Sequence, residues 1–333
     1  MSQRPDAPSR RLHLGLYLPT WDDAAGAMVP WPAQRDLARL AEDAGWDTIW
    51  VADHFAPRLS DDRIQRFWEC WTLLAALAEA TSRVTIGPLI TPTAFRTPPL
   101  LARMAATVDA ISGGRLLVGL GAGADRERGF EFVGLPVAER ASAFAEALEV
   151  IVPLLRGDQV DHAGRYYAVR DYQLGLPQAR PGGPPVWIAG QKPRMIGLAA
   201  RWGDAFNLNR VVSSPEQLAG PFAELEAACL AIGRDPATIQ RTGYAFIALH
   251  ARPAAADSAI TGTPEEIAAR IHALHQAGME HLLLVVDDEE RTGLGWPLTT
   301  PRHVERFAPV MAALRHFEDQ DRAQPTSARG TPA

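Results

Sequence analysis

The stretch Gly45-Trp46-Asp47-Thr48-Ile49-Trp50-Val51-Ala52-Asp53-His54-Phe55 decides how the rest of the chain is interpreted. Gly45 ends a helical pattern, and both alternating sets of positions in residues 46–54 are largely apolar, which is typical of a parallel strand covered on both faces. Asp53 and His54 therefore follow a buried strand, where α/β proteins place their chemistry. An isolated Asp-His pair would more often be a turn residue and a solvated side chain, so its meaning depends on the surrounding pattern.

Strand and helix patterns alternate from this stretch along the whole chain. Seven further strands are predicted at residues 12–18, 83–91, 115–121, 185–189, 204–208, 243–249 and 280–286. Residues 214–217 and 263–266 have the spacing of capping boxes at helix starts, and residues 158–169 predict a small hairpin inserted after the fourth helix. Eight strand–helix units predict an α/β protein, a (β/α)8 TIM barrel formed by a single domain over residues 12–317. The polar ends, 1–11 and 318–333, are predicted to be flexible tails.

Composition narrows the classes of protein. The chain has 333 residues, 47% of them hydrophobic, and a net charge of −6. Charges of both signs are scattered, so no basic stripe indicates nucleic acid, and no apolar run approaches the ~18 residues of a membrane span. The first eleven residues lack the apolar core of a signal peptide. Cys70 and Cys229 are predicted to be buried thiols in a reducing compartment, so we expect a cytoplasmic protein.

The segment 119–124 reads Gly-Leu-Gly-Ala-Gly-Ala and fits the loose dinucleotide fingerprint G-x-G-x-x-A between a strand and a helix. It belongs to the fourth strand–helix unit, and helix fills the span in which an acidic strand end should follow ~20 residues later. We therefore interpret it as a tight turn that lets a flat ligand approach the backbone.

The turn after the fifth strand, Ala189-Gly190-Gln191-Lys192-Pro193, contains the only lysine of the chain. Free N–H groups at a helix N-terminus together with an ammonium group suit a phosphate. An ordinary turn with an exposed lysine explains the same residues, and both interpretations stay open.

Other chemistries are disfavoured by missing motifs. A metal site is disfavoured because the histidines lack ligand spacing, and a serine hydrolase is disfavoured because there is no G-x-S-x-G elbow. A Schiff-base lysine would have to lie in a strand, whereas Lys192 lies beyond one.

An ordered series of segments resembles the bacterial-luciferase-like monooxygenase superfamily over about residues 12–286. The segments are residues 44–54, 71–78, 81–87, 95–98, 109–115, 119–123, 162–167 and 184–190. The resemblance implies a (β/α)8 barrel that uses FMN or the deazaflavin coenzyme F420 on a small organic substrate. It also implies a homodimer. Because the sequence shows no second nucleotide-binding pattern, we expect a separate reductase to supply reduced cofactor.

Site residues follow from the same resemblance. His54 matches the active-site histidine and Asp53 its acidic neighbour, whereas Leu89 and Ile90 match the place of a non-proline cis peptide behind the cofactor ring. The remaining matches are the ring-side turn (Ala122, Gly123) and the phosphate turn (Ala189, Gly190, Gln191, Lys192). Thr91 and Asn207 are added as cofactor contacts because they lie at the carboxyl ends of predicted strands, not because they match the family. No metal is expected.

The sequence departs from the family pattern at two places. Residues 124–126 stand where many relatives carry a bulky or acidic side chain, so the polar wall of the substrate pocket stays open. The acidic run 287–290 would repel the anionic tail of F420 and favours FMN, whereas the form Asp53-His54-Phe55 favours F420. The reduced cofactor would activate O2 or exchange a hydride, with His54 as the proton shuttle. A flavin-binding paralogue without turnover and an NAD(P)-dependent dehydrogenase remain alternatives, and residues 251–262 are a candidate lid.

Overall fold

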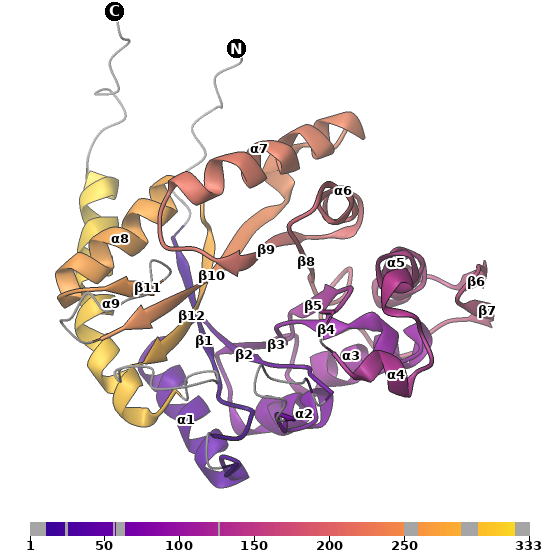
Figure 1. Cartoon of the computed structure of the whole chain (residues 1–333), viewed down its shortest axis with the longest axis horizontal. Helices are drawn as coiled ribbons and strands as arrows, with labels where there is room; N and C mark the ends of the chain where they lie inside the picture. Colours follow the sequence, from indigo (N-terminus) through magenta and orange to yellow (C-terminus); the bar gives the residue numbers. More distant parts are fainter. Residues whose placement is uncertain are drawn as a thin grey trace, which may run out of the picture.

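The computed structural model describes residues 11–23, 26–55, 57, 64–125, 127–249, 259–287 and 299–323. Its centre is a parallel sheet that curls into a barrel, with helices around the outside (Figure 1). The strands of this sheet are β1 (His13–Tyr17), β2 (Thr48–Val51), β3 (Thr85–Pro88), β4 (Thr91–Pro92), β5 (Val118–Gly121), β8 (Val186–Gly190), β9 (Ala205–Val211), β10 (Gln240–Ala248), β11 (Ala259–Thr261) and β12 (His281–Asp287).

The order of neighbouring strands is β3-β2-β1-β12-β10-β9-β8-β5-β4, and every pair is parallel. β3 and β4 form one strand interrupted at residues 89–90, and β11 pairs only with β10 among the described strands, so the barrel has the predicted eight. Backbone hydrogen bonds close the ring. Ile86 donates its N–H to the carbonyl of Arg115 and accepts the N–H of Leu117, both at 2.9 Å.

Helices cover the outside of the barrel as the apolar periodicity predicts. They are α1 (Trp31–Asp43), α2 (Cys70–Ala80), α3 (Pro98–Ile111), α4 (Gly129–Phe132), α5 (Arg140–Arg156), α6 (Pro193–Trp202), α7 (Glu216–Ala231), α8 (Pro264–Gln276) and α9 (Pro301–Ala323). Short 3₁₀ turns are η1 (Thr93–Phe95), η2 (Val137–Glu139) and η3 (Pro236–Thr238). Because α9 runs on to residue 323, the predicted tail beginning at 318 starts too early.

One of the two predicted capping boxes is complete. The Thr263 side chain accepts the N–H of Glu266, whose own side chain accepts the N–H of Thr263. At α7 only half of the motif forms. Gln217 Oε1 accepts the N–H of Ser214 at 3.2 Å, but the helix begins after Pro215, which makes no side-chain capping bond.

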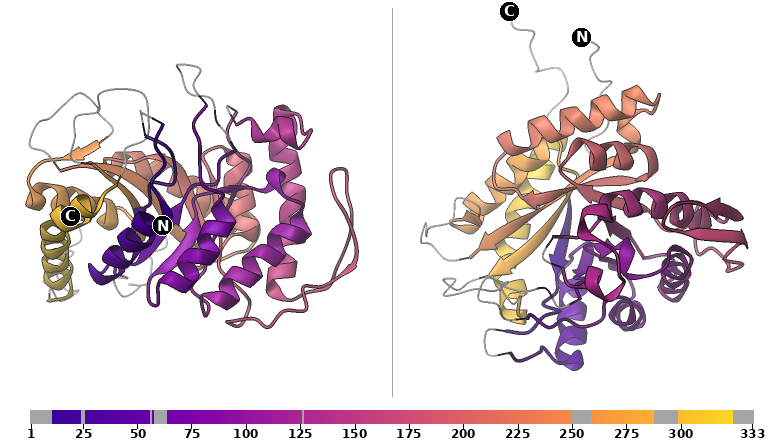
Figure 2. Two further views of the ribbon diagram at one scale, coloured as in Figure 1. Left: turned by 90° about the horizontal axis from the view of Figure 1, so that it is seen from below. Right: turned by 45° about the vertical axis from the view of Figure 1, so that its right-hand side comes forward.

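The predicted insertion is an antiparallel hairpin after α5, formed by β6 (Val160–Ala163) and β7 (Ala168–Tyr172). It projects away from the barrel in every view (Figures 1 and 2). The carboxylate of Glu146 on α5 fixes its turn by accepting the N–H groups of Tyr166 and Tyr167 at 2.9 and 2.7 Å.

Two apolar clusters follow from the alternation of side chains along the strands. Ile49 and Val51 of β2 belong to the large cluster that includes the helices, whereas Trp50 belongs to a second cluster built from the opposite strand faces. This inner cluster contains Tyr17, Trp21, Trp50, Ala52, Trp187, Ala205, Leu283 and Val285. The ring centroids of Trp50 and Trp187 lie 4.7 Å apart, so aromatic side chains fill the barrel interior. Both cysteines are buried, as predicted.

The candidate lid at 251–262 falls mainly outside the described residues, as does the acidic run beyond Asp287. Ala259–Thr261, at the end of the lid segment, form strand β11 alongside β10 rather than a loop. In the described ranges, no helix combines the length and the hydropathy that crossing a bilayer requires.

Candidate active site

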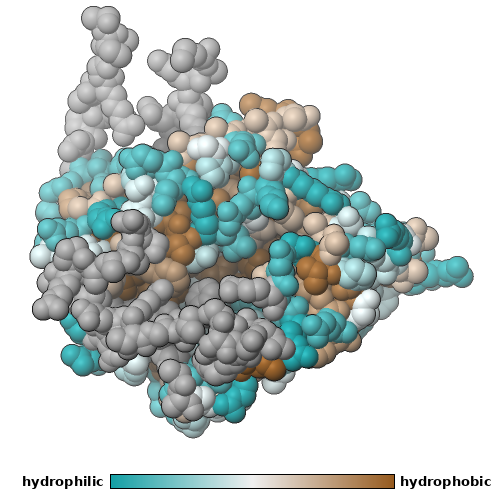
Figure 3. Space-filling model, in the orientation of Figure 1, coloured by the Kyte–Doolittle hydropathy of each residue, from teal (hydrophilic) through white to brown (hydrophobic). Residues whose placement is uncertain are grey.

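A cavity of about 790 Å³ opens at the carboxyl ends of the barrel strands. Figure 3 shows apolar residues deep in the hollow at the centre of this face, beneath a more hydrophilic rim. Residues at or after every barrel strand contribute to its lining. Nine of the predicted site residues are among them: His54, Leu89, Ile90, Ala122, Gly123, Ala189, Gly190, Gln191 and Lys192.

Asp53 and Thr91 were predicted as cofactor contacts, but neither lines the cavity. Successive strand residues face opposite ways, so Asp53 cannot share the cavity side with His54. The Asp53 carboxylate is 1% exposed and forms a bidentate pair with Arg96 at 2.7 and 3.1 Å. Thr91 donates its hydroxyl to the same carboxylate at 2.8 Å. Burial raises the pKa of Asp53, although Arg96 acts in the opposite direction.

Asn207 also lies away from the cavity. Its side-chain amide is buried and donates to the Thr242 hydroxyl at 2.9 Å. Two residues further along β9, Asn209 has the same facing and lines the cavity. The sequence thus identified the correct strand face but a position too deep inside the barrel.

His54 is held by a residue that the sequence interpretation missed. Its Nδ1 lies 2.6 Å from Oε2 of Glu127, whose other oxygen accepts the backbone N–H of Phe55 at 2.8 Å. The Glu127 side chain is 1% exposed and the His54 side chain 29%. Phe67 packs beside the imidazole, with ring centroids 5.0 Å apart. No local motif signals Glu127, because the chain brings it to His54 only through the barrel.

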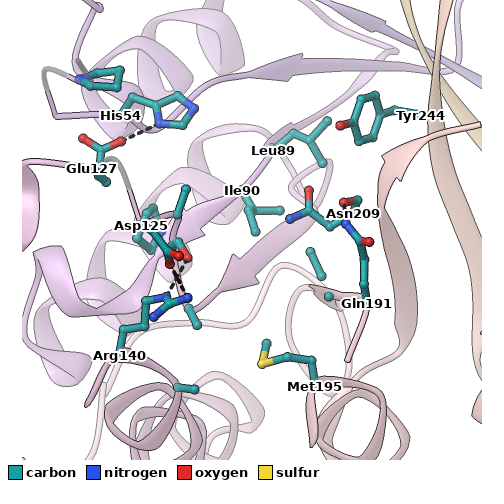
Figure 4. A pocket seen from close by; sticks show the side chains of 18 of the residues that line it. His54, Leu89, Ile90, Asp125, Glu127, Arg140, Gln191, Met195, Asn209 and Tyr244 are labelled. Atoms are coloured by element: carbon teal, nitrogen blue, oxygen red, sulfur yellow. Dashed lines mark hydrogen bonds and ion pairs between the residues drawn. The ribbon is translucent and has the colours of Figure 1, made fainter. Parts of the chain in front are cut away.

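Leu89 and Ile90 form an apolar ledge on one wall of the cavity (Figure 4). The peptide bond between them is cis, as the resemblance implies. Both polar groups of Leu89 are occupied. Its N–H donates to the carbonyl of Val51 at 2.8 Å, and its carbonyl accepts the Tyr17 hydroxyl at 3.1 Å. The ledge is therefore fixed from two other strands.

The glycines of segment 119–124 make room for this ledge. A Cβ at Gly119 would overlap the carbonyl oxygen of Pro88, and one at Gly121 would overlap Cδ1 of Ile90. Gly123 has φ +81°, which disfavours other residues. Protein packing accounts for the first two glycines, so their spacing gives no support to a dinucleotide fingerprint.

The turn after β8 leads into α6 at the cavity edge. Lys192 is the N-cap residue, Pro193 is the first helical residue, and the cap makes no side-chain hydrogen bond. The Gln191 side chain donates to the backbone carbonyl of Asn209, which joins the ends of β8 and β9. Lys192 is exposed and lines the cavity, so its ammonium group is accessible to a ligand bound there.

Arg140, at the start of α5, secures the turn after β5. Its guanidinium pairs with Asp125 and donates to the carbonyls of Gly123 at 3.3 Å and Val137 at 2.8 Å. Figure 4 shows this pair on the wall below Glu127. Asp125 is one of the three residues, 124–126, at which the sequence departs from its relatives, and its negative charge is paired with Arg140.

Two further cavity residues were not predicted. Gln65 is 1% exposed, and its Oε1 has no hydrogen-bond partner in the described part of the chain. Among the described residues, the contact of its Nε2 is a long one, 3.5 Å, with the carbonyl of Asp22. Tyr244 of β10 faces the ledge in Figure 4, and burial raises the pKa of its phenol. Neither residue lies in a motif. The direction of a loop side chain such as Gln65 is set only by the fold, and for Tyr244 the alternation along the strand does not give the depth of the cavity.

Fold and site together define a TIM-barrel protein with a ligand cavity at its catalytic face. The sequence model of the luciferase-like monooxygenases matches residues 13–260, and the chain belongs to this family. It is 30% identical over 211 residues to the 5,10-methylenetetrahydromethanopterin reductase of Archaeoglobus fulgidus, covering 63% of this chain and 58% of that protein. It is 34% identical over 176 residues to the F420-dependent glucose-6-phosphate dehydrogenase of Rhodococcus erythropolis, covering 51% of each.

Similar solved structures share the fold across nearly the whole chain. An F420-dependent secondary alcohol dehydrogenase, solved with an F420-acetone adduct, has a TM-score of 0.75 at 21% identity and covers 92% of this chain and 99% of that one. An EDTA monooxygenase from a Chelativorans species has a TM-score of 0.75 at 18% identity, covering 91% and 94%. The sequence alignments, by contrast, span little more than half the length of the two curated relatives.

Proposed function

We propose that the protein is an oxidoreductase that transfers a hydride between coenzyme F420 and a small organic substrate. One observation carries the proposal. A single cavity combines a flat apolar ledge at Leu89 and Ile90, a phosphate-type turn at Lys192, and a histidine with one ring nitrogen unpaired among the described residues. A cofactor-dependent enzyme needs these features in order to bind the cofactor, orient its ring and transfer a proton to or from the substrate.

The residues present fit a flavin-type cofactor. The ledge and the turn at Ala122 and Gly123 offer flat backbone and apolar surface to a ring system, and Gln191 with Lys192 offers donors for a phosphate. When bound, the deazaflavin supplies the hydride acceptor or donor. The chain itself then orients the substrate, takes up or returns a proton at His54, and limits water through apolar side chains such as Leu283 and Val285.

Relatives favour F420 over FMN. The glucose-6-phosphate dehydrogenase relative is named for its use of F420. FMN with oxygen chemistry is the second candidate, because the matching family is described as monooxygenases and the EDTA monooxygenase has the same fold. A NAD(P)-dependent dehydrogenase loses its basis, since Gly119 and Gly121 serve packing. The homodimer, the separate reductase and the cytoplasmic location remain predictions.

Equilibrium titration tests the proposal. Cofactor-free protein is titrated with F420, FMN and NADPH, and binding is followed by quenching of ligand or tryptophan fluorescence. The F420-loaded protein is then mixed with a panel of alcohols, and absorbance at the F420 maximum is recorded. We expect saturable F420 binding and substrate-dependent bleaching. Binding of NADPH alone, or of no cofactor, would contradict the proposal. F420 binding without bleaching by any alcohol of the panel, and without reoxidation of reduced F420 by the matching carbonyl compounds, would support the non-catalytic paralogue.

A further inference from the structure

We propose that Glu127 is a positioning residue that fixes His54 in one tautomer, with the proton on Nδ1 and the lone pair of Nε2 directed into the cavity. The use of that lone pair as a proton acceptor rests on the proposed function. The tautomer itself is a property of the protein alone and can be measured without a cofactor.

Both oxygens of the Glu127 carboxylate are engaged with residues next to the end of β2. Oε1 accepts the backbone N–H of Phe55 at 2.8 Å, and Oε2 lies 2.6 Å from Nδ1 of His54. A carboxylate offers only acceptors, so the ring nitrogen facing it must carry the hydrogen. A neutral imidazole has a single N–H, and Nε2 is therefore left with its lone pair.

Packing leaves the ring little freedom to change this arrangement. The Glu127 side chain is 1% exposed, so water cannot easily replace it as the partner of Nδ1. Phe67 lies against the imidazole at 5.0 Å between centroids. Figure 4 shows the ring nitrogen opposite Glu127 directed away from that carboxylate, and no described residue forms a hydrogen bond with it.

The arrangement gives His54 a defined direction of proton transfer. Under the proposed function, oxidation of an alcohol would break its O–H bond and transfer the proton to Nε2. Bound F420 would supply the acceptor for the hydride that leaves the carbinol carbon as the carbonyl forms. The imidazolium keeps its Nδ1–H on Glu127, whose negative charge stabilises the new positive charge. Reduction of a carbonyl uses the same atoms in reverse.

Nitrogen NMR tests the tautomer directly. Cofactor-free protein with ¹⁵N-labelled histidine is examined at a pH high enough to keep the ring neutral, and the His54 signals are assigned by their loss in His54→Asn. We expect a pyrrole-type shift for Nδ1 and a pyridine-type shift for Nε2. In Glu127→Ala, which removes the acceptor, the proton should move toward Nε2, and in Glu127→Gln the shift should be smaller because the amide oxygen still accepts the Nδ1 hydrogen. Glu131→Gln, an exposed neighbour on α4, should leave the spectrum unchanged.

The opposite tautomer in the wild type would overturn the proposal, as would an unchanged spectrum in both Glu127 variants with matched melting temperatures. A kinetic arm then separates positioning from binding. With F420 bound, Glu127→Gln should lower kcat while the cofactor dissociation constant stays the same, and the loss should not exceed that of His54→Ala. If wild type binds no F420, the proposed function fails while the tautomer result stands on its own.

Discussion

Arg96 and Asp53 form a buried bidentate ion pair behind the cavity wall, with contacts of 2.7 and 3.1 Å. The same guanidinium reaches Glu69 at 2.6 Å, and the Glu69 side chain in turn caps the start of α2. Asp53 directly precedes His54, and Thr91 directly follows Ile90. This network therefore anchors the two strand ends that carry the histidine and the ledge, without touching the cavity.

Arg96→Met should destabilise the protein by about 3–5 kcal/mol, because it leaves a buried carboxylate without its counter-charge. Burial already raises the pKa of Asp53 in the folded protein. The contribution of Asp53 to the free energy of unfolding is therefore largest below the ordinary pKa of Asp and is lost as the pH rises through the raised pKa. Removing Arg96 raises that pKa further. Urea unfolding should thus show a larger deficit at about pH 7.5 than at about pH 5. A deficit independent of pH, or one no larger than in the surface control Arg35→Met, would contradict this account.

Glu42 should be a source of acid sensitivity at the opposite end of the barrel. Although burial would raise its pKa, the N–H groups of Val84, Arg83 and Ser82 hold it at about 2. Its stabilising contribution is therefore complete above the ordinary Glu value and is lost as pH falls toward 2. Glu42→Gln should lose about 1.5–3 kcal/mol at neutral pH and progressively less in acid. Thermal unfolding against pH, compared with exposed Glu79→Gln, measures the difference; parallel curves would rule it out.

Lys192→Ala should weaken binding of FMN or F420 about 10- to 100-fold, the effect of losing one charge-assisted contact to phosphate. Riboflavin lacks the phosphate, so its affinity should change little. Arg201→Ala, at the other end of α6, is the matched control. Equal weakening for FMN and riboflavin would mean that Lys192 supports the fold rather than the phosphate.

His54→Ala should fold normally and lose about 10²–10⁴ in turnover, the usual contribution of one proton-transfer group. Cofactor affinity should be nearly unchanged. Steady-state kinetics on the F420-loaded protein, with exposed His316→Ala alongside, provide the measurement. Turnover close to wild type at a matched melting temperature would remove His54 from the mechanism.

Local pattern was sufficient for most of the barrel. Buried strands 4–9 residues long and amphipathic helices alternate regularly, so both their number and the catalytic end follow from periodicity. The same two-residue alternation places Asp53 and His54 on opposite sides of the chain, so the pattern itself argues against assigning both residues to the cofactor. The prediction that Asn207 contacts the cofactor was wrong for a related reason. Periodicity specifies which face of the strand a residue lies on, but not how deep the cavity reaches along that strand.

The remaining site residues depend on contacts between distant segments. Glu127 lies 73 residues from His54 along the chain, and Gln65 belongs to a loop with no periodic pattern. Barrel closure and contacts between loops determine where these two side chains point. A short window of sequence carries no information about such contacts. The glycines of 119–124 are instructive in the same way. Their spacing suggested a ligand, whereas at Gly121 the atom that requires the space belongs to Ile90.

A crystal structure of the protein with F420 bound tests the central claim most directly. We predict that the ring lies against Leu89 and Ile90, that the phosphate lies at Gln191 and Lys192, and that the hydride-carrying carbon faces the space before Nε2 of His54. A substrate atom would then fit within about 3.5 Å of both the carbon and the nitrogen. A ring bound elsewhere, or a cavity that stays empty at saturating F420 and FMN, would contradict the account.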